Sequence, residues 1–302
     1  MNGRKLKKPP ISIIFIIAIF VAITYAIIVT INDNEYTDYP GYINAMQGAA
    51  APVITPFVPI ITPPFTEGIH VTEITDTHHL KLVSRDFPIT TTLCYSLLRE
   101  VWPDLAASSA YVRLRETAFN AMRDLFSEVD VGEIGTLFIA SGYRCYYEQS
   151  VLYANAPNPE YVKPAGHSEH QLGLAVDILS GDNYYSMRGT EEARWLRENA
   201  PRFGLILRYP EHKQDITGVP YEPWHFRYVG RVHAWYMGEH DFVLEEYIEY
   251  LRDSGVVQTE FDGRNYYIYY QLPQNGMVFF PEHLSFMISS TNTGGFIVTA
   301  WR

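Results

Sequence analysis

The chain has 302 residues, of which 47% are hydrophobic and 19% are charged, so a buried core is affordable and wholesale disorder is excluded. Four of the 23 basic residues lie within residues 1–10, which leaves 19 Lys and Arg against 34 Asp and Glu in the rest. Such an acidic chain excludes nucleic-acid binding through bulk electrostatics. A neutral or cationic small substrate, or a locally basic pocket, fits this charge better.

The N-terminus carries the pattern of a membrane anchor. Residues 11–31 form a run of 21 residues without a charge, which is long enough as a helix to cross a hydrocarbon layer of about 30 Å. Basic residues precede the run and acidic residues follow it. We therefore expect a cytoplasmic basic tail at 1–10, a transmembrane signal anchor at 11–31 and an extracytoplasmic remainder. A cleaved signal peptide is the alternative, but no small-x-small cleavage site stands near the end of the run.

The next segment is rich in proline and has no sustained apolar period. Proline removes backbone donors and favours extended chain, so residues 32–78 are predicted to be a semi-rigid tether. A folded domain is expected at 79–252 and a small C-terminal β extension at 253–302. Only two cysteines are present, Cys94 and Cys145, without a CxxC pair, so a thiolate metal site is not expected. A disulfide between them stays open.

The folded part alternates short strands with helices, which indicates an α+β fold. Thr190 is expected to cap a helix whose first turn carries Glu191 and Glu192. Asn275-Gly276 and Gly294-Gly295 are turn signals in the C-terminal part. We expect strands at 80–83, 136–140, 174–178, 205–208, 225–229, 266–271 and 296–301, and helices at 114–129, 146–153 and 243–251.

Three residues stand out as candidate metal ligands: His170, Asp177 and His225. Catalytic zinc takes three nitrogen or oxygen ligands and keeps a fourth position for water. Gly173 allows a sharp turn between the first two, and the strand at 174–178 can present Asp177 from one face. Spacing alone leaves the metal site undecided, because a lone histidine is more often a structural hydrogen-bonding residue and the HExxH signature is absent.

A peptide hydrolase also needs groups that handle protons and negative charge. Glu222 lies in the string EPWH with His225, and the fixed backbone of Pro223 lets both side chains point into one cleft. An unligated carboxylate beside a metal is a natural general acid and base. Arg144 can supply positive charge to a developing oxyanion or to a substrate carboxylate.

Three strings together carry a family resemblance: SGYRCYYEQ at 141–149, GHSEHQLGLAVDI at 166–178 and EPWHFRYVG at 222–230. They resemble the three signatures of the VanY-type D-alanyl-D-alanine carboxypeptidases, a branch of the zinc D,D-peptidases that also includes L,D-carboxypeptidases. The resemblance covers about residues 80–251. It implies a small zinc D,D-peptidase fold, with a short central antiparallel sheet, flanking helices and the C-terminal β appendage as an addition. Ala165, His167 and Leu172 depart from the residues often found in the family.

The resemblance also implies roles. It implies a Zn²⁺ site at His170, Asp177 and His225, and it implies that the catalytic groups are Glu222 and Arg144. It further implies that Gln149 and Ser168 line the substrate pocket. The expected function is removal of the terminal D-alanine from peptidoglycan stem peptides. An L,D-carboxypeptidase, an endopeptidase of the same fold, or a non-catalytic wall-binding module are the alternatives.

Several neighbouring residues admit two interpretations. Arg208 can approach the site or form a salt bridge elsewhere, and Glu169 can orient a ligand or be solvated. His167 is expected to line the cleft or bond locally rather than bind metal. Trp224 can stack on substrate or pack beneath the site, and Cys145 carries little weight as a nucleophile because no paired base is evident.

Overall fold

A computed structural model describes residues 67–302 except for 91–96, 130–133, 157–161 and 182–186. The expected cytoplasmic tail at 1–10, the expected signal anchor at 11–31 and the tether up to residue 66 lie outside the described residues. The chain divides into two units, 1–55 and 56–302, and every described residue belongs to the second. Among the described residues, no helix has the length and apolar character needed to cross a membrane.

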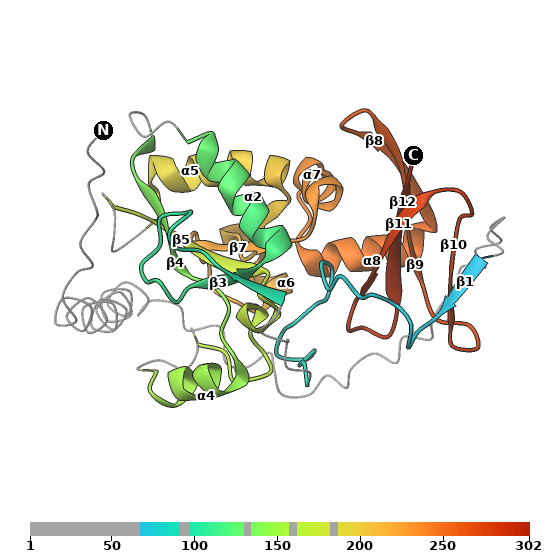
Figure 1. The fold of residues 1–302 in the computed structure, drawn as a ribbon, viewed down its shortest axis with the longest axis horizontal. Coiled ribbons are helices and arrows are strands. Elements are labelled where there is room, and N and C mark those ends of the chain that lie inside the picture. The colour runs from blue at the N-terminus through green and yellow to red at the C-terminus, as the bar shows by residue number, and fades with distance from the viewer. Residues whose placement is uncertain (1–66, 91–96, 130–133, 157–161, 182–186) are drawn as a thin grey trace, which may run out of the picture. The chain divides into compact units, whose positions relative to one another are not determined.

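A four-stranded antiparallel sheet forms the centre of the first part of this unit (Figure 1). Its spatial order is β4-β5-β7-β6, so strands that are far apart in the sequence become neighbours. The pairing of β5 with β7 is the important one for function, because it joins two of the sequence motifs. The strands are β4 (Leu137–Ser141), β5 (Ala175–Ser180), β6 (Leu205–Leu207) and β7 (His225–Tyr228).

One face of this sheet is covered by helices α2 (Glu116–Ser127) and α5 (Glu191–Asn199), whose apolar stripes pack into the same core cluster as the strands. Side chains alternate between the two faces of a strand. Val176, Ile178 and Phe226 enter this core. Asp177 and His225 therefore point to the opposite face, which is free of these helices and can hold a site.

The remaining elements connect or flank this sheet. Thr190 caps α5 as expected, with its side chain accepting a hydrogen bond from the Ala193 N–H at 3.1 Å. The short strands β2 (Leu98–Glu100) and β3 (Arg113–Arg115) pair with each other. The other helical elements are α4 (Tyr146–Ala154), η2 (Glu169–Leu172), η3 (Ala200–Phe203), η4 (Glu211–Lys213), α6 (Gln214–Thr217), α7 (Arg231–Glu239) and α8 (Leu244–Ser254).

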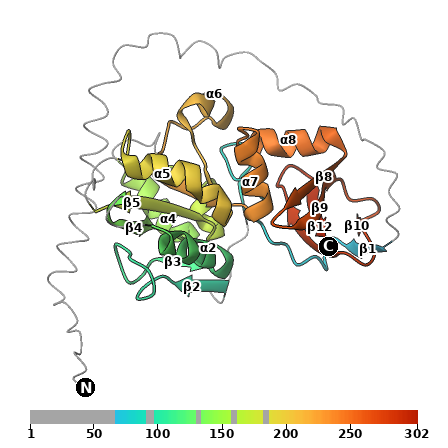
Figure 2. The same ribbon diagram turned by 90° about the horizontal axis from the view of Figure 1, so that it is seen from above.

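The C-terminal residues form a second four-stranded antiparallel sheet, in the order β11-β12-β9-β8. The strands expected at 266–271 and 296–301 are present as β9 and β12, each within two residues of its expected bounds. In Figure 2, α7 lies between the first sheet and the C-terminal strands, and α8 runs along β8 and β9. The strands are β8 (Val256–Phe261), β9 (Arg264–Gln271), β11 (Ser285–Ser290) and β12 (Phe296–Trp301), and β10 (Met277–Phe280) lies outside this sheet.

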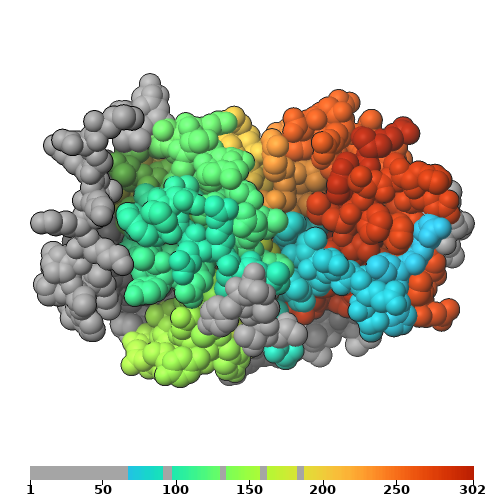
Figure 3. All heavy atoms as spheres, in the orientation of Figure 1, coloured from blue at the N-terminus to red at the C-terminus, as the bar shows by residue number. Residues whose placement is uncertain are grey.

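The end of the predicted tether is part of the fold, which corrects its expected boundary at residue 78. Strand β1 (Glu67–His70) pairs antiparallel with β10, and Asp76 forms a bridge with Ile288. Ile69 and Val71 pack against the small core of the C-terminal strands, which explains why this stretch does not remain a free spacer. Figure 3 shows the segment from residue 67 lying against the C-terminal part of the chain.

The strand expected at 80–83 is wrong. Leu80, Leu82 and Val83 are buried, but the backbone of this segment forms no ladder with a neighbouring strand. Residues 76–82, named the strap here, have no regular secondary structure and pack beside α7, α8 and the C-terminal strands. The Leu80 N–H donates to Ser289 Oγ at 2.9 Å and the Leu82 N–H donates to the Thr291 carbonyl oxygen at 2.9 Å.

The C-terminal sheet shares its hydrophobic core with the helices that precede it. One cluster of buried residues joins the strap, α7, α8, β9 and β12. The C-terminal β extension expected at 253–302 is present, and beside its own small core it shares a second cluster with the preceding helices, because Leu251 of α8 and Ile268 of β9 pack together. Buried His233 of α7 adds a polar link, with Nδ1 2.9 Å from the Tyr247 hydroxyl and Nε2 3.0 Å from Thr299 Oγ1.

Candidate metal centre and active site

Asp177 and His225 are paired residues on neighbouring strands. They face each other in the register of β5 and β7, and Asp177 Oδ1 lies 3.0 Å from His225 Nδ1. The other carboxylate oxygen, Oδ2, lies 3.4 Å from Nε2 of His170. One ligand atom from each of the three residues lies within 4.8 Å of the others. Among the described residues, this is the one group of three or more His, Cys, Asp or Glu side chains that could hold a metal ion. The group is able to hold a divalent metal ion.

His170 is positioned by a very short helix that ends at a left-handed residue. Gly173 follows η2 with φ at 66°, a conformation that glycine adopts without strain. A Cβ atom there would lie 2.9 Å from Leu98 Cδ2 and 3.0 Å from Arg115 Cγ, so any other residue would also displace these side chains. His170 Nδ1 lies 2.7 Å from the Gly142 carbonyl oxygen. Since a carbonyl only accepts, Nδ1 carries the proton and Nε2 keeps its lone pair for a metal.

Glu222 stands beside the three ligands without belonging to the group. Its Oε2 lies 3.8 Å from His225 Nδ1, and the residue is only 8% exposed. Burial raises the pKa of Glu222 to about 7, and the charge of Asp177 also acts in that direction. A carboxyl group with this pKa can take up and release a proton near neutral pH, as a general acid and base must.

Burial and charge act differently on the three candidate ligands. Burial lowers the pKa of His170 to about 4, and the nearby charge of Arg144 acts in the same direction. Burial would also lower the pKa of His225, but its contacts with Asp177 and Glu169 prevail and raise that pKa to about 9. Burial opposes ionisation of Asp177, yet the two histidines hold its pKa below the usual value. Asp177 is thus an anion ready to act as a ligand.

Arg144 and Gln149 are held together next to the ligand group. Arg144 Nε donates to Gln149 Oε1 at 2.8 Å, Nη1 donates to Ser141 Oγ at 2.6 Å, and the backbone N–H donates to the His170 carbonyl oxygen at 3.3 Å. The Gln149 amide also donates to the Lys163 carbonyl oxygen at 2.6 Å. Ser168 immediately precedes η2 and is buried. The structure therefore places Arg144 and Gln149 together, and it places Ser168 next to the ligand helix.

Four of the residues with two interpretations have a defined environment in the structure. Arg208 is fully buried and pairs with Glu169 and Glu245. Glu169 is buried as well, so it is not solvated. His167 Nδ1 lies 3.0 Å from the Ser84 carbonyl oxygen, outside the metal group. Trp224 packs against the main core.

Cys145 has a structural role as well, because its thiol caps helix α4 by accepting a hydrogen bond from the Glu148 N–H. Cys94 lies outside the described residues.

Two residues around the site were missed by sequence reasoning. The Tyr209 ring lies 5.0 Å from the His225 ring, and Arg227 approaches Glu169 Oε1 to 2.9 Å. Arg227 lies two positions after His225, and the alternation of strand β7 could have placed both on the same face.

The sheet, the histidine–aspartate–histidine group and the adjacent carboxylate define the class of zinc D,D-peptidase-like proteins. A family model described as VanY D-alanyl-D-alanine carboxypeptidase matches residues 111–231. The chain belongs to this family. It is 42% identical over 179 residues to the D-alanyl-D-alanine carboxypeptidase of Enterococcus faecium, which covers 59% of this chain and 58% of that relative. The chain thus spans little more than half the length of this relative.

Solved structures show the same likeness. A vancomycin-resistance D,D-dipeptidase, VanXYg, in complex with a D-Ala-D-Ala phosphinate analogue, is similar with a TM-score of 0.68 and 29% identity, over 78% of this chain and 98% of that chain. The LdcB LD-carboxypeptidase is similar with a TM-score of 0.51 and 35% identity, over 57% of this chain and 86% of that one. The fold of this chain is therefore the mixed α/β fold of these peptidases.

Proposed function

We propose that this protein is a zinc-dependent carboxypeptidase that removes the terminal D-alanine from peptidoglycan stem peptides. The observation that carries the proposal is the convergence of His170, Asp177 and His225 with an unligated carboxylate, Glu222, at their edge. The family membership and the D,D-peptidase relatives support the same reaction class.

The donor set suits zinc. Two imidazoles and one carboxylate are the ligand types that catalytic zinc sites use, and three protein ligands leave one position for water or substrate. When bound, zinc supplies a Lewis acid that polarises the scissile carbonyl and lowers the pKa of water to about 7. The remaining chemistry belongs to the protein's own side chains.

Glu222 is the proton carrier in this proposal. Its carboxylate removes a proton from the attacking water, the water oxygen bonds to the carbonyl carbon, and the C–N bond of the amide breaks. The same proton then passes to the nitrogen of the leaving D-alanine, so the group returns to its starting state. Its burial and its raised pKa support both halves of this cycle.

Arg144 supports binding and charge stabilisation. A carboxypeptidase substrate ends in a free carboxylate, and a guanidinium group binds such a group in a bidentate manner. Gln149 and Ser141 fix the orientation of Arg144 through hydrogen bonds from Nε and Nη1. Gln149 and Ser168 would line the same pocket.

The protein would act at the outer face of a cell membrane. The uncharged run at 11–31, with basic residues before it and acidic residues after it, supports a single-pass signal anchor with the peptidase part outside the cytoplasm.

The likeness to the LdcB LD-carboxypeptidase supports a second candidate function, in which the D-alanine removed is the last residue of a tetrapeptide.

One experiment tests both candidates. Full-length protein in detergent is incubated with zinc and either a muramyl pentapeptide or a muramyl tetrapeptide, and products are read by mass spectrometry. We expect the pentapeptide to lose one alanine and the Glu222→Ala variant to leave it intact. Loss of alanine from the tetrapeptide alone would assign the L,D activity, and absence of both products with zinc bound would remove the proposal.

A further inference from the structure

Glu169 is a buried carboxylate whose two oxygen atoms have different surroundings. Oε1 accepts a hydrogen bond from Arg208 Nε at 2.8 Å and lies 2.9 Å from Arg227 Nη1. Oε2 lies 3.6 Å from Nε2 of His225. Among the described residues neither Oε2 of Glu169 nor Nε2 of His225 has another hydrogen-bond partner. The two unsatisfied atoms therefore face each other.

The opposite nitrogen of His225 faces the ligand group. Nδ1 lies 3.0 Å from Asp177 Oδ1 and 3.8 Å from Glu222 Oε2. A neutral imidazole carries its proton on only one nitrogen, and a metal requires the other. If the proton sits on Nε2, next to a carboxylate that can only accept, Nδ1 is left with its lone pair toward Asp177.

The charged groups around Glu169 are balanced. Arg208 is clamped from its other side by Glu245 of α8, with Nη1–Oε2 at 2.9 Å and Nη2–Oε1 at 2.6 Å. Two carboxylates and two guanidinium groups thus form the cluster, in which all but Glu245 are buried. The two guanidinium groups beside Oε1 match the charge of a carboxylate, whose free oxygen Oε2 can only accept a hydrogen bond from a neighbour.

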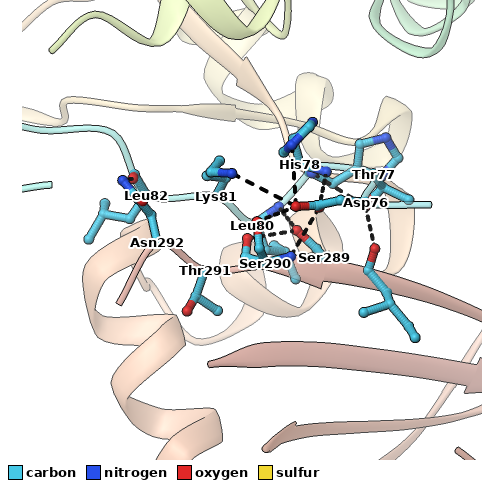
Figure 4. Close-up of polar contacts among 12 residues, drawn as sticks. Asp76, Thr77, His78, Leu80, Lys81, Leu82, Ser289, Ser290, Thr291 and Asn292 are labelled. Atoms are coloured by element: carbon cyan, nitrogen blue, oxygen red, sulfur yellow. Dashed lines mark hydrogen bonds and ion pairs between the residues drawn. The ribbon is translucent and has the colours of Figure 1, made fainter. Parts of the chain in front are cut away.

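Arg227 is held by the strap. Its Nη2 donates to three strap carbonyl oxygens, those of His78 at 3.0 Å, His79 at 3.1 Å and Lys81 at 3.1 Å. Figure 4 shows how the strap is itself fixed to the C-terminal strands, through Asp76 and Ser290 and through the Leu80 N–H and Ser289. The position of Glu169 Oε1 is thereby set by contacts that begin in the C-terminal sheet.

We propose that Glu169 is a positioning residue, which accepts the Nε2–H of His225 and so makes Nδ1 the metal-binding atom of that ligand. This inference deepens the proposed function and rests on it for the identity of the metal. A carboxylate that orients a metal-bound histidine in this manner contributes about 10- to 100-fold to metal affinity. A purely structural Glu169, which only neutralises Arg208 and Arg227, would not contribute to metal affinity through His225.

The tautomer of His225 can be measured directly in the wild-type protein. Full-length protein labelled with ¹⁵N-histidine and loaded with zinc is studied by long-range ¹H–¹⁵N correlation NMR, with His225 assigned through a His225→Gln variant. We expect the His225 proton on Nε2 and the zinc-shifted nitrogen to be Nδ1. A proton on Nδ1 in zinc-loaded, active protein would overturn the positioning role and leave the proposed function intact. Absence of zinc binding would instead overturn the proposed function.

A pair of matched variants gives the second measurement. Glu169→Gln is compared with Glu192→Gln, which alters another buried carboxylate, one that accepts from Ser180 Oγ at 2.9 Å. Zinc dissociation constants are measured by competition with a chromophoric chelator. We expect a 10- to 100-fold increase for Glu169→Gln and less than a twofold change for Glu192→Gln. Equal affinities in Glu169→Gln and wild type, or equal losses in both variants, would contradict the proposal; if Glu169→Gln does not fold, the NMR result decides.

Discussion

Asp177 and His225 occupy directly opposed positions on β5 and β7, with Asp177 Oδ1 3.0 Å from His225 Nδ1. The strand pairing thus brings two motifs that are 48 residues apart into contact. The Asp177→Asn variant keeps the shape and removes the charge of this ligand. We expect zinc affinity to fall more than about 100-fold, because a metal ligand must be an available anion or lone pair. Competition with a chelator measures the loss, circular dichroism verifies the fold, and an unchanged affinity would remove Asp177 from the ligand set.

The Glu222→Gln variant separates proton transfer from metal binding. The amide fills the same volume but cannot carry a proton, so kcat is expected to fall by about 10²- to 10⁴-fold. Zinc affinity should change little, because Glu222 is outside the ligand group. Steady-state release of D-alanine gives kcat, and Glu192→Gln serves as the control for replacing a buried glutamate. A variant that retains kcat would exclude Glu222 as the proton carrier.

Arg144→Lys tests the substrate carboxylate. Lysine retains the positive charge but loses the planar donors that reach Gln149 and Ser141. We expect KM for a free-acid peptide to rise about tenfold while zinc affinity stays unchanged. The same peptide with an amidated C-terminus provides the control, because wild type and variant should process it at similar, low efficiency. An equal effect on both peptides would assign Arg144 to transition-state charge rather than to carboxylate binding.

Gly173 and Gly218 form a matched pair for backbone strain. Both have φ at 66°, but a Cβ at Gly218 would meet nothing within 4 Å, whereas one at Gly173 would clash with Leu98. Gly218→Ala is expected to lower the free energy of unfolding by about 1–2 kcal/mol. Gly173→Ala should cost about 1–3 kcal/mol more and weaken zinc binding, because the clash displaces η2 and His170. Urea unfolding measures the difference, and equal losses would show that the close contact relaxes freely.

Two buried histidines outside the metal group predict acid sensitivity. Burial lowers the pKa of His233 to about 3, and burial likewise lowers the pKa of His79 to about 3, against about 6.5 when unfolded. Below pH 6.5 the unfolded chain binds a proton that the folded state excludes. The stability from each neutral histidine is therefore complete above pH 6.5 and is lost between pH 6.5 and 3, at about 1.4 kcal/mol per pH unit.

The His233→Gln variant isolates one of these two contributions. Zinc-free wild type and variant are unfolded by urea at several pH values from 7.5 to 5. The free energy of unfolding of the variant should fall less steeply with decreasing pH, by about 1.4 kcal/mol per pH unit below pH 6.5. Parallel slopes in the two proteins would show that His233 is protonated in the folded state.

The sequence predicts the individual elements around the site better than it predicts the long-range contacts that bring them together. Helix α5 was placed by its cap, Thr190, and the strand that carries Asp177 by its apolar run, since both signals are local. The contact between Asp177 and His225 depends on register, which a single sequence does not specify. The resemblance to a family therefore identified the ligand set, where spacing left it undecided.

Long-range packing accounts for the failures. Residues 80–83 have the composition of a strand, yet Leu80 and Leu82 bond to Ser289 and Thr291, more than 200 residues later. The local sequence around Glu169 fits both a solvated side chain and one that orients a ligand. Its burial depends on Arg208, from the segment between β6 and η4, and on Arg227 of β7.

The pairing of β1 with β10 and the shared core around α8 bear on how the protein can be shortened for study. A fragment cut to residues 79–252 would contain every residue proposed for catalysis, but it would uncover Tyr247, Ile248 and Leu251 and release the strap from Ser289. Such a fragment would expose a large apolar surface and would aggregate. A shortened form for crystallography or screening should therefore begin no later than Glu67 and include strand β12, which ends at Trp301.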